Sequence, residues 1–448
     1  FLEIFFACAK TGAIMVPVNA HLALPELEYA IGDCAPRLLV YAAETADKVR
    51  RLRQTPSEGM HCLVQGSSAA AADSALADLV EGQPPDEPAP DGAVDLGDPL
   101  LIMYTSGTTG APKGAVLTHK NFLYGAINAQ HSYHLDAACK SLVVAPLFHI
   151  AALAASVTPV VYAGGALVLK NFDNPSDIID CIMREKITFM FGVPVMYEMM
   201  AKSPRWPSAN FADIDFFMAG GAPMPVSLIR RYQAEKGVAF AQGYGMTETL
   251  RMTSLELTDA SRKAGSIGKA VLHARLKILD DDGREVAPGE IGQIVFSGPT
   301  VFAGYWNKPR ATEAVLQHGW FHTGDLGRCD DEGFLYLVGR KNELIICAGK
   351  NIYAAEVERA IEQHPQVAEA AVVGLPDPKR GEIVAAFIRL EDDRSLAEGE
   401  LLHFLEDKIA AFKCPRKVAF VRHFPRNKTG KIQKDKLGLS RECPVLPS

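Results

Sequence analysis

The sequence predicts an α/β protein with a large N-terminal domain and a small α+β C-terminal domain. A chain of 448 residues is too long for one ordinary hydrophobic core. Between residues 99 and 194, apolar strand-like stretches alternate with a helical pattern, which is typical of a largely parallel, buried sheet. After about residue 270, short strands and turns dominate. We therefore predict a large domain at 1–340, with α/β sheet subdomains and a β-rich subdomain, and a small domain at 341–448.

Individual elements follow from periodicity. Apolar, β-branched runs predict buried strands at 99–104, 141–148, 165–170 and 187–194. A helix is predicted at 176–186, because Ile178, Ile179, Ile182 and Met183 fall on one face. Asp282-Gly283 joins two alternating runs, which indicates a hairpin. In the small domain we predict helices at 354–364 and 400–412 and strands at 367–375 and 383–390, with Phe412 on the apolar face of the second helix.

Composition excludes several classes of protein. Apolar residues make up 48% and charged residues 22%, as in soluble globular proteins. The net charge of −7 gives no reason to expect nucleic-acid binding. Nine scattered cysteines, none at metal-ligand spacing, favour a reduced, cytoplasmic protein.

The segment Leu142–Leu169 carries no Lys, Arg, Asp or Glu and is long enough to span a bilayer. Pro146, Pro159 and the pair Gly164-Gly165 interrupt it, so we predict a buried strand and core helix and no integral membrane segment. The chain opens in an apolar segment without Met, which predicts a truncated N-terminus. Oligomer formation is left open.

The stretch Tyr104–Ala115, "YTSGTTGAPKGA", predicts a phosphate-binding loop. Its glycines let backbone N–H groups converge on an anion, its hydroxyls add donors, and Lys113 adds a mobile positive charge. It is not a Walker A sequence, because Gly110 is followed by Ala-Pro-Lys-Gly. A solvent loop rich in turn formers is the alternative.

The loop resembles the phosphate-binding signature of the adenylate-forming (AMP-binding) superfamily, which includes acyl-CoA synthetases, aryl-CoA ligases and luciferases. Five further segments resemble motifs of that family in the expected order. They are "GGAP" (220–223), "QGYGMTE" (242–248), "GWFHTGDLG" (319–327), "GRKNELIICAGKNIYAAEVE" (339–358) and "PRNKTGKI" (425–432). The chain is thereby identified as a member of the acyl-CoA synthetase, or fatty acid–CoA ligase, type.

The resemblance implies a carboxylic acid substrate, ATP, Mg²⁺ and coenzyme A, with acyl-AMP and pyrophosphate formed before the thioester. It implies nucleotide-binding roles for residues in each motif. These are Thr105, Ser106, Gly107, Thr108, Thr109, Gly110, Lys113, Gly221, Ala222, Pro223, Gly243, Tyr244, Gly245, Met246, Thr247, Asp325, Arg340, Gly349 and Lys431. Lys113, Thr247, Glu248 and Lys431 are the implied catalytic residues.

The chemistry of several of these residues suits the implied roles. Glu248 beside a triphosphate would be repelled without an intervening cation, so we expect it to ligate Mg²⁺. Tyr244 offers a ring for stacking on adenine. Asp325 can accept from both ribose hydroxyls, and Arg340 suits a second ribose contact. Taken singly, Tyr244 would be a core residue and Asp325 a turn former.

The small domain is expected to swivel on a hinge between the two half-reactions. In the family it withdraws the C-terminal lysine, here Lys431, and brings up the strand around Gly349. The pivot is commonly Asp or Lys, whereas this chain has Asn342.

Two residues bear on the acid that is bound. His149 is either a packed residue or a gate of the acyl tunnel, since an aromatic residue lines that tunnel in similar synthetases. Arg251 is unexpected after "GYGMTET". We predict that it points to solvent, because a buried, unpaired arginine is costly; pointing inward, it would pair with a second carboxylate, as in a malonyl-like acid.

A medium- or long-chain fatty acid is the predicted substrate, with aryl- or malonyl-type acids as alternatives. Three rival functions stay open: an adenylation enzyme that loads a carrier protein, a non-catalytic sensor of nucleotide or acyl ligand, and a phosphotransferase that uses the Gly-rich loop.

Overall fold

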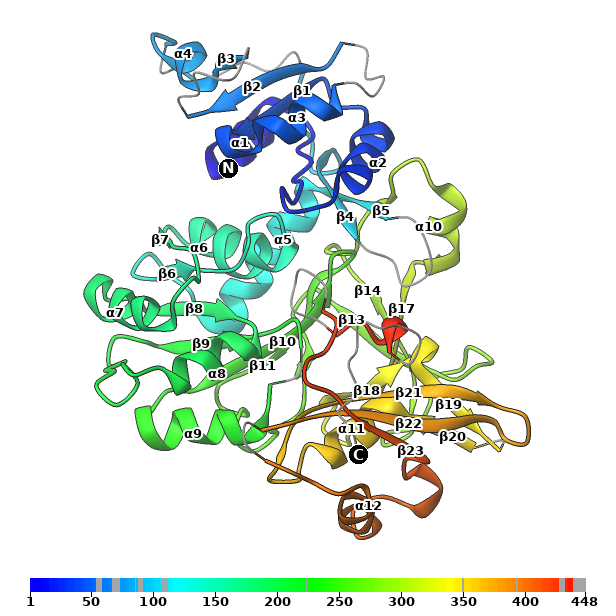
Figure 1. The fold of residues 1–448 in the computed structure, drawn as a ribbon. Helices are drawn as coiled ribbons and strands as arrows, with labels where there is room; N and C mark the ends of the chain where they lie inside the picture. Colours follow the sequence, from blue (N-terminus) through cyan, green and yellow to red (C-terminus); the bar gives the residue numbers. More distant parts are fainter. Residues whose placement is uncertain are drawn as a thin grey trace. The chain divides into compact units, whose positions relative to one another are not determined.

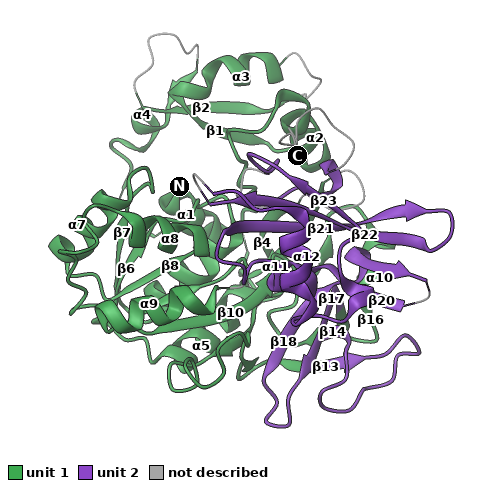
Figure 2. Ribbon diagram, turned by 60° about the horizontal axis from the view of Figure 1, so that its bottom comes forward, with its two compact units in different colours: residues 1–276, 296–321 green, residues 277–295, 322–448 purple. Residues whose placement is uncertain are grey.

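The computed structural model describes most of the chain: residues 1–53, 59–66, 73–84, 86–87, 92–105, 112–222, 224–348, 350–391, 394–426 and 432–437. These residues divide into two compact units. Unit 1 comprises 1–276 and 296–321, and unit 2 comprises 277–295 and 322–448 (Figure 2). The prediction of a domain boundary at 340/341 stays a prediction.

The centre of unit 1 is a seven-stranded sheet in the order β12-β11-β10-β9-β8-β6-β7. Its strands are β6 (Lys140–Val143), β7 (Ala166–Leu169), β8 (Phe189–Gly192), β9 (Phe216–Ala219), β10 (Phe240–Met246), β11 (Leu250–Leu255) and β12 (Lys269–Ala270). The five neighbouring strands β10, β9, β8, β6 and β7 are parallel, whereas β11 and β12 run antiparallel to their neighbours. The predicted, largely parallel sheet is therefore confirmed.

Helices cover both faces of this sheet (Figure 1). On one face α7 (Pro175–Glu185), α8 (Pro194–Lys202) and α9 (Val226–Lys236) bury residues such as Ile182, Tyr197 and Tyr232 against Met190 and Phe217. On the other lie α5 (His119–Tyr133), a π-helix (Ala152–Val157) and α6 (Thr158–Tyr162). Such double coverage explains why the strands are apolar on both faces.

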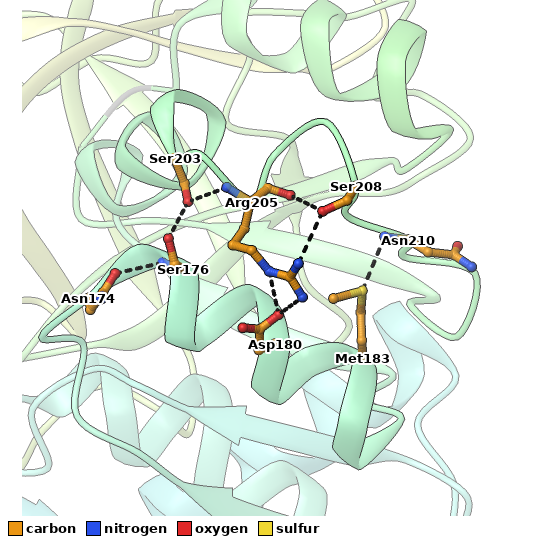
Figure 3. Close-up of polar contacts among 8 residues, drawn as sticks. All are labelled: Asn174, Ser176, Asp180, Met183, Ser203, Arg205, Ser208 and Asn210. Atoms are coloured by element: carbon orange, nitrogen blue, oxygen red, sulfur yellow. Dashed lines mark hydrogen bonds and ion pairs between the residues drawn. The ribbon is translucent and has the colours of Figure 1, made fainter.

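Polar contacts hold α7 to the loop that follows α8 (Figure 3). Asn174 caps α7 by accepting from the Ser176 backbone N–H at 2.9 Å. The hydroxyls of Ser176 and Ser203 lie 2.8 Å apart, and Arg205 Nε donates to Asp180 Oδ1 at 2.8 Å. The predicted helix at 176–186 is confirmed, with Ile178, Ile179 and Ile182 buried.

Two smaller sheets complete unit 1. One contains β4 (Pro99–Thr105), β5 (Lys113–Thr118) and β15 (Gly304–Tyr305), in the order β15-β5-β4. The other contains β1 (Leu38–Ala42), β2 (His61–Gln65) and β3 (Ser74–Ala75). The remaining helices of unit 1 are α1 (Leu2–Thr11), α2 (Leu24–Cys34), α3 (Ala46–Leu52), α4 (Leu76–Val80) and α10 (Pro309–Val315).

The β-rich section after residue 270 is a five-stranded sheet that the division into units cuts through. It contains β13 (Arg275–Leu279), β14 (Gly292–Ser297), β16 (Leu316–Gln317), β17 (Trp320–Cys329) and β18 (Leu335–Arg340). Gly283, at φ 78°, lies in the turn that the bridge between Leu279 and Glu285 closes. The predicted hairpin at Asp282-Gly283 is confirmed.

The C-terminal part of unit 2 is an α+β fold. Its sheet contains β19 (Leu344–Cys347), β20 (Lys350–Tyr353), β21 (Val367–Asp377), β22 (Gly381–Leu390) and β23 (Lys417–Phe420), with helices α11 (Ala354–Ile361) and α12 (Glu398–Glu406). The helix predicted at 400–412 ends earlier, at Glu406. Leu401 and Leu405 are buried, whereas Phe412 is exposed, because the chain leaves the helix before that turn. The predicted helix therefore extends six residues beyond the observed end, Glu406 to Phe412.

Within the part of the chain that the structure describes, every helix is too short or too polar to cross a membrane. Leu142–Leu169 forms β6, the π-helix, α6 and β7, as the breaking prolines and glycines predict.

Candidate active site

The candidate site of unit 1 lies where the parallel strands β9 and β10 end. Gly221 and Ala222 follow β9 and are exposed, with Gly221 at φ 79°. Gly243 to Met246 form the end of β10, and Thr247 and Glu248 lie in the turn to β11. The carboxyl ends of neighbouring parallel strands meet at one edge of a sheet, which is where ligands of α/β folds bind.

Glu248 is a buried carboxylate, with 6% of its surface exposed. Its Oε1 accepts a hydrogen bond from the Tyr305 hydroxyl at 2.9 Å, and its backbone carbonyl accepts from the Phe302 N–H at 2.8 Å. Burial, together with the negative charge of Glu248, raises the pKa of Tyr305, so the phenol stays a donor. The carboxylate is held in one orientation with its second oxygen available for a cation.

Thr105 and Lys113 flank the Gly-rich loop, at the end of β4 and the start of β5. They face each other across β4 and β5, and Thr105 Oγ1 donates to the Lys113 carbonyl at 3.4 Å. The Lys113 amine lies 5.2 Å from the centroid of the Tyr305 ring. Tyr305 therefore touches both the candidate metal-binding carboxylate and the candidate phosphate-binding lysine.

Sequence reasoning missed Tyr305. It lies 57 residues from Glu248 in the chain, and only the pairing of Gly304-Tyr305 with Val116-Ala115 brings it to the site. The single available signal was its position in a turn-rich stretch, "FAGYWNKP", between predicted strands. That signal does not distinguish it from the adjacent Trp306.

Gly245 is required where it stands. A Cβ at this position would lie 1.7 Å from the Leu250 carbonyl oxygen, so any side chain would collide with the backbone of β11. Leu250 has a φ of 53°, and the register between β10 and β11 shifts between Tyr244 and Gly245. A tight, irregular turn thus sets the position of Thr247 and Glu248.

Tyr244 is a buried residue, 9% exposed, whose ring centroid lies 6.0 Å from that of Phe296. Its role in adenine stacking stays a prediction.

His149 lies just before the π-helix and is partly buried. Its Nδ1 accepts from the Ala151 backbone N–H at 3.3 Å, and burial lowers the pKa of its imidazole. The imidazole thus caps the start of the helix, and whether it also gates an acyl tunnel stays a prediction. The π-helix beside it, Ala152–Val157, is of a kind that often marks functional sites.

Arg251 contradicts the prediction of a solvent-facing arginine. It is 8% exposed, and both Nη atoms are buried without a hydrogen-bond partner among the described residues. Its Cζ lies 4.4 Å from the centroid of the Tyr133 ring. A cation–π contact contributes about 0.5–2 kcal/mol, whereas removing an ion from water costs several kcal/mol. Strand β11 places the side chain inside because it packs on α5 and the π-helix.

The candidate ribose-binding residues of unit 2 lie together. Asp325 and Arg340 are register partners on β17 and β18, and Arg340 Nε lies 3.2 Å from Asp325 Oδ1. The Asp325 side chain is 7% exposed and that of Arg340 33% exposed. The pair holds the carboxylate in place and leaves part of the guanidinium accessible.

Asn342 and the flanks of the C-terminal lysine motif also belong to unit 2. Asn342 lies exposed in a one-turn helix, Lys341–Glu343, next to an ion pair of 2.8 Å between Lys341 and Asp281. Lys434 Nζ binds Glu343 at 2.7 Å and Glu358 at 2.8 Å.

Several predicted residues lie outside the described residues, and their placement is not part of the site above. They are Ser106, Gly107, Thr108, Thr109, Gly110, Pro223, Gly349 and Lys431.

Comparison with known proteins identifies the family. The sequence model for "AMP-binding enzyme" matches residues 1–306, and that for "AMP-binding enzyme C-terminal domain" matches residues 356–431. The chain belongs to the AMP-binding enzyme family.

Curated relatives match nearly the whole chain. A feruloyl-CoA synthase of Amycolatopsis sp is 39% identical over 97% of this chain and 85% of its own length. An indoleacetate–CoA ligase of Aromatoleum aromaticum is 39% identical over 97% and 84%, respectively. A long-chain-fatty-acid–CoA ligase of Mycobacterium tuberculosis is 36% identical over 97% and 84%.

Solved structures agree. ATP-bound MatB from Rhodopseudomonas palustris superposes with a TM-score of 0.89 at 31% identity, covering 97% of this chain and 85% of that one. The o-succinylbenzoate CoA synthetase MenE from Bacillus subtilis, in complex with the acyl-adenylate intermediate OSB-AMP, has a TM-score of 0.85 at 30% identity over 98% and 87%. The chain is thus a ligase of the acyl- and aryl-CoA class, a family that uses ATP and CoA.

Proposed function

We propose that this enzyme transfers adenylate from ATP to a carboxylic acid, releasing pyrophosphate, and then forms a thioester with CoA, releasing AMP. The observation that carries the proposal is the linked set Glu248–Tyr305–Lys113 at the carboxyl edge of the sheet. Such a set suits an anionic phosphate chain neutralised by a cation on one side and an amine on the other.

The donor set of unit 1 suits Mg²⁺. This ion takes one or two carboxylates and completes its shell with water and substrate phosphates, so a single oriented carboxylate is sufficient. Glu248 would hold the ion, which would offset the charge of the triphosphate. Among the described residues no cluster of three or more His, Cys, Asp or Glu side chains forms an all-protein metal cage, which suits this shared kind of site.

The remaining residues position the reactants. Lys113 would contact the phosphates that leave, and Thr247 the α-phosphate that is attacked. Asp325 and Arg340 would hold the ribose, so that the acid carboxylate meets the α-phosphate in line. Lys431 would orient the two reacting groups during adenylation, as the family motif implies. No covalent enzyme intermediate is required.

The names of the relatives bear on which carboxylic acid the enzyme uses. The sequence favoured a fatty acid, but the names of two of the relatives at 39% identity refer to ring-bearing acids, feruloyl and indoleacetate. The fatty-acid ligase is 36% identical. We therefore favour a ring-bearing acid and keep a fatty acid as the alternative.

An acid-dependent exchange of labelled pyrophosphate into ATP tests the proposal. The screen covers fatty, aromatic and dicarboxylic acids, and CoA is then added to the acids that respond. We expect AMP, pyrophosphate and free acyl-CoA. ADP would indicate a phosphotransferase, exchange without acyl-CoA would indicate a carrier-loading enzyme, and no exchange with any acid would refute adenylation.

A further inference from the structure

Arg251 is a buried cation for which the described residues provide no hydrogen-bond or ion-pair partner at either Nη atom. The side chain is 8% exposed, both Nη atoms lack a hydrogen-bond partner, and no ion pair of the described residues includes it. Buried charges in folded proteins are otherwise paired with an opposite charge or hydrogen-bonded. A cation in this condition can accept a partner that the described residues do not supply, such as a carboxylate of a bound ligand.

The described contact of the Arg251 guanidinium is with an aromatic ring. The guanidinium stacks on Tyr133 of α5. Tyr133 belongs to an apolar cluster that contains Met218 and packs against Ala151, just before the π-helix, and Ala155, within it. The ring supplies a favourable face for the cation but no acceptor. The planar fork of N–H donors therefore makes no hydrogen bond through either Nη atom to the described residues.

The position of Arg251 connects it to the candidate active site. It pairs with Gly245 across β10 and β11, three residues after Glu248. Its Cδ would lie 3.0 Å from a Cβ built on Gly243, so the side chain runs back along β10 over a position without a side chain. The guanidinium thus lies on the side of the sheet that packs against α5. It is displaced along the strand from Thr247 and Glu248, the residues assigned to the reacting phosphate.

We propose that Arg251 is a specificity-determining residue that binds a second carboxylate at the far end of the acid substrate. This inference rests on the proposed function, because it assigns the substrate class of the same site. The acid would place its reacting carboxylate beside Thr247 and Glu248 and its second carboxylate on Arg251.

A carboxylate is the occupant that the geometry favours. No described residue accepts a hydrogen bond from either Nη atom, and a guanidinium with both Nη atoms available binds the two oxygens of a carboxylate in parallel. A neutral phenol or methoxy oxygen would accept one hydrogen bond but leave the buried charge uncompensated. A hydrocarbon tail would leave both unsatisfied.

The experiment compares each dicarboxylic acid with its own monoamide. The panel contains linear dicarboxylic acids of graded length and the para-carboxy derivative of cinnamic acid, each with the matching amide, plus the unsubstituted monocarboxylic acid. Pyrophosphate release is measured for the wild type, Arg251→Lys and Arg251→Met. The control is Arg231→Met, since Arg231 also stacks on an aromatic ring, that of Trp206, but is exposed and paired with Glu235.

We expect the wild type to prefer at least one dicarboxylate over its amide by roughly a hundredfold in kcat/KM. Arg251→Met should abolish that ratio, mainly through KM, and improve the use of the monocarboxylic acid. Arg251→Lys should keep part of the ratio, and Arg231→Met all of it. Arg251→Met should fold, because it removes an unpaired buried charge, and its melting temperature is measured alongside.

Two results would overturn the assignment: equal use of dicarboxylates and amides by the wild type, or an unchanged ratio in Arg251→Met. These differ from failure of the proposed function, in which no acid of any kind supports pyrophosphate exchange. A preference for a phenolic acid that Arg251→Met abolishes would replace the second carboxylate with a neutral oxygen.

Discussion

At the scale of single residues, Tyr305 explains how a buried glutamate is kept in a defined orientation. Its hydroxyl donates to Glu248 and its ring lies beneath the Lys113 amine. A charged acceptor buried without a donor would be destabilised, so the phenol both stabilises and aims the carboxylate.

Tyr305→Phe tests this positioning role. A hydrogen bond to a charged group contributes about 1.5–3 kcal/mol, so kcat/KM for pyrophosphate release should fall about ten- to a hundredfold. The ring under Lys113 is kept. Tyr41→Phe is the matched control, because the Tyr41 hydroxyl donates to Asp73 at 2.6 Å in the three-stranded sheet β1-β2-β3. It should leave kcat/KM unchanged, and an equal fall in both variants would contradict the role of Tyr305.

His149 predicts a pH dependence of stability. Burial lowers the pKa of its imidazole below that of the unfolded chain, about 6.5. The unfolded state therefore binds more protons as the pH falls through this value, so stability is present above about pH 6.5 and is lost progressively below it. Urea midpoints of the wild type between neutral and mildly acidic pH should fall more steeply than those of His149→Gln.

The exposed His131 provides the control for this series. His131→Gln makes the same substitution on the surface of the protein and should keep the wild-type slope. If the urea midpoints of the wild type and His149→Gln fell equally steeply with pH, another group would govern the loss of stability at acidic pH.

At the scale of elements, the turn from β10 to β11 is the feature on which the site depends. It brings Gly245 against the Leu250 carbonyl, places Leu250 in the left-handed region, and presents Thr247 and Glu248 at the edge of the sheet. The same turn starts the strand that carries Arg251 inward. The geometry of one turn thus links the phosphate end of the site to its proposed acid end.

Gly245→Ala should disrupt this turn. A Cβ 1.7 Å from a backbone oxygen cannot be accommodated without moving β10 or β11, so we expect a loss of about 3 kcal/mol or more in the free energy of unfolding, measured by urea denaturation. Gly32→Ala in α2 is the control, because a Cβ there meets nothing within 4 Å. It should be neutral or stabilise by up to about 1 kcal/mol. Equal urea midpoints for the two variants would contradict the steric argument.

At the scale of the whole molecule, the proposed function consists of two half-reactions that share the acyl-adenylate, which the first forms and the second consumes. The chain has two compact units, with Glu248 and Lys113 in unit 1 and Asp325 and Arg340 in unit 2. The family motif assigns Lys431 to adenylation alone. Its loss should therefore separate the two steps.

Lys431→Ala should remove most acyl-adenylate formation and spare the conversion of supplied acyl-AMP and CoA to the thioester. Each step is measured alone, by pyrophosphate exchange and by thioester release. Lys428→Ala, in the same basic segment, should retain both steps. If Lys431→Ala slowed the two steps equally, a general effect on folding or binding would replace the proposed role.

The sequence could predict most of the fold and the identity of the motifs. Alternating apolar runs indicated the parallel sheet, and breakers within Leu142–Leu169 excluded a membrane helix. The ends of the elements were predicted less accurately than their presence. The apolar spacing of Leu401 and Leu405 continues to Phe412, although the helix ends at Glu406. Periodicity records which residues can share a face, but the end of a helix depends on what packs there.

By itself, therefore, the sequence determined the order of the motifs, the class of enzyme and the residues proposed to contact phosphate and ribose, because these are properties of short segments. Only the tertiary structure brought Tyr305 to Glu248, paired Asp325 with Arg340, and turned Arg251 into the interior. The reason is that each of these arrangements depends on strand pairing or packing between segments distant in the chain. A local sequence pattern shows that burying an unpaired arginine would be costly in free energy, but it does not show that the fold nevertheless buries Arg251.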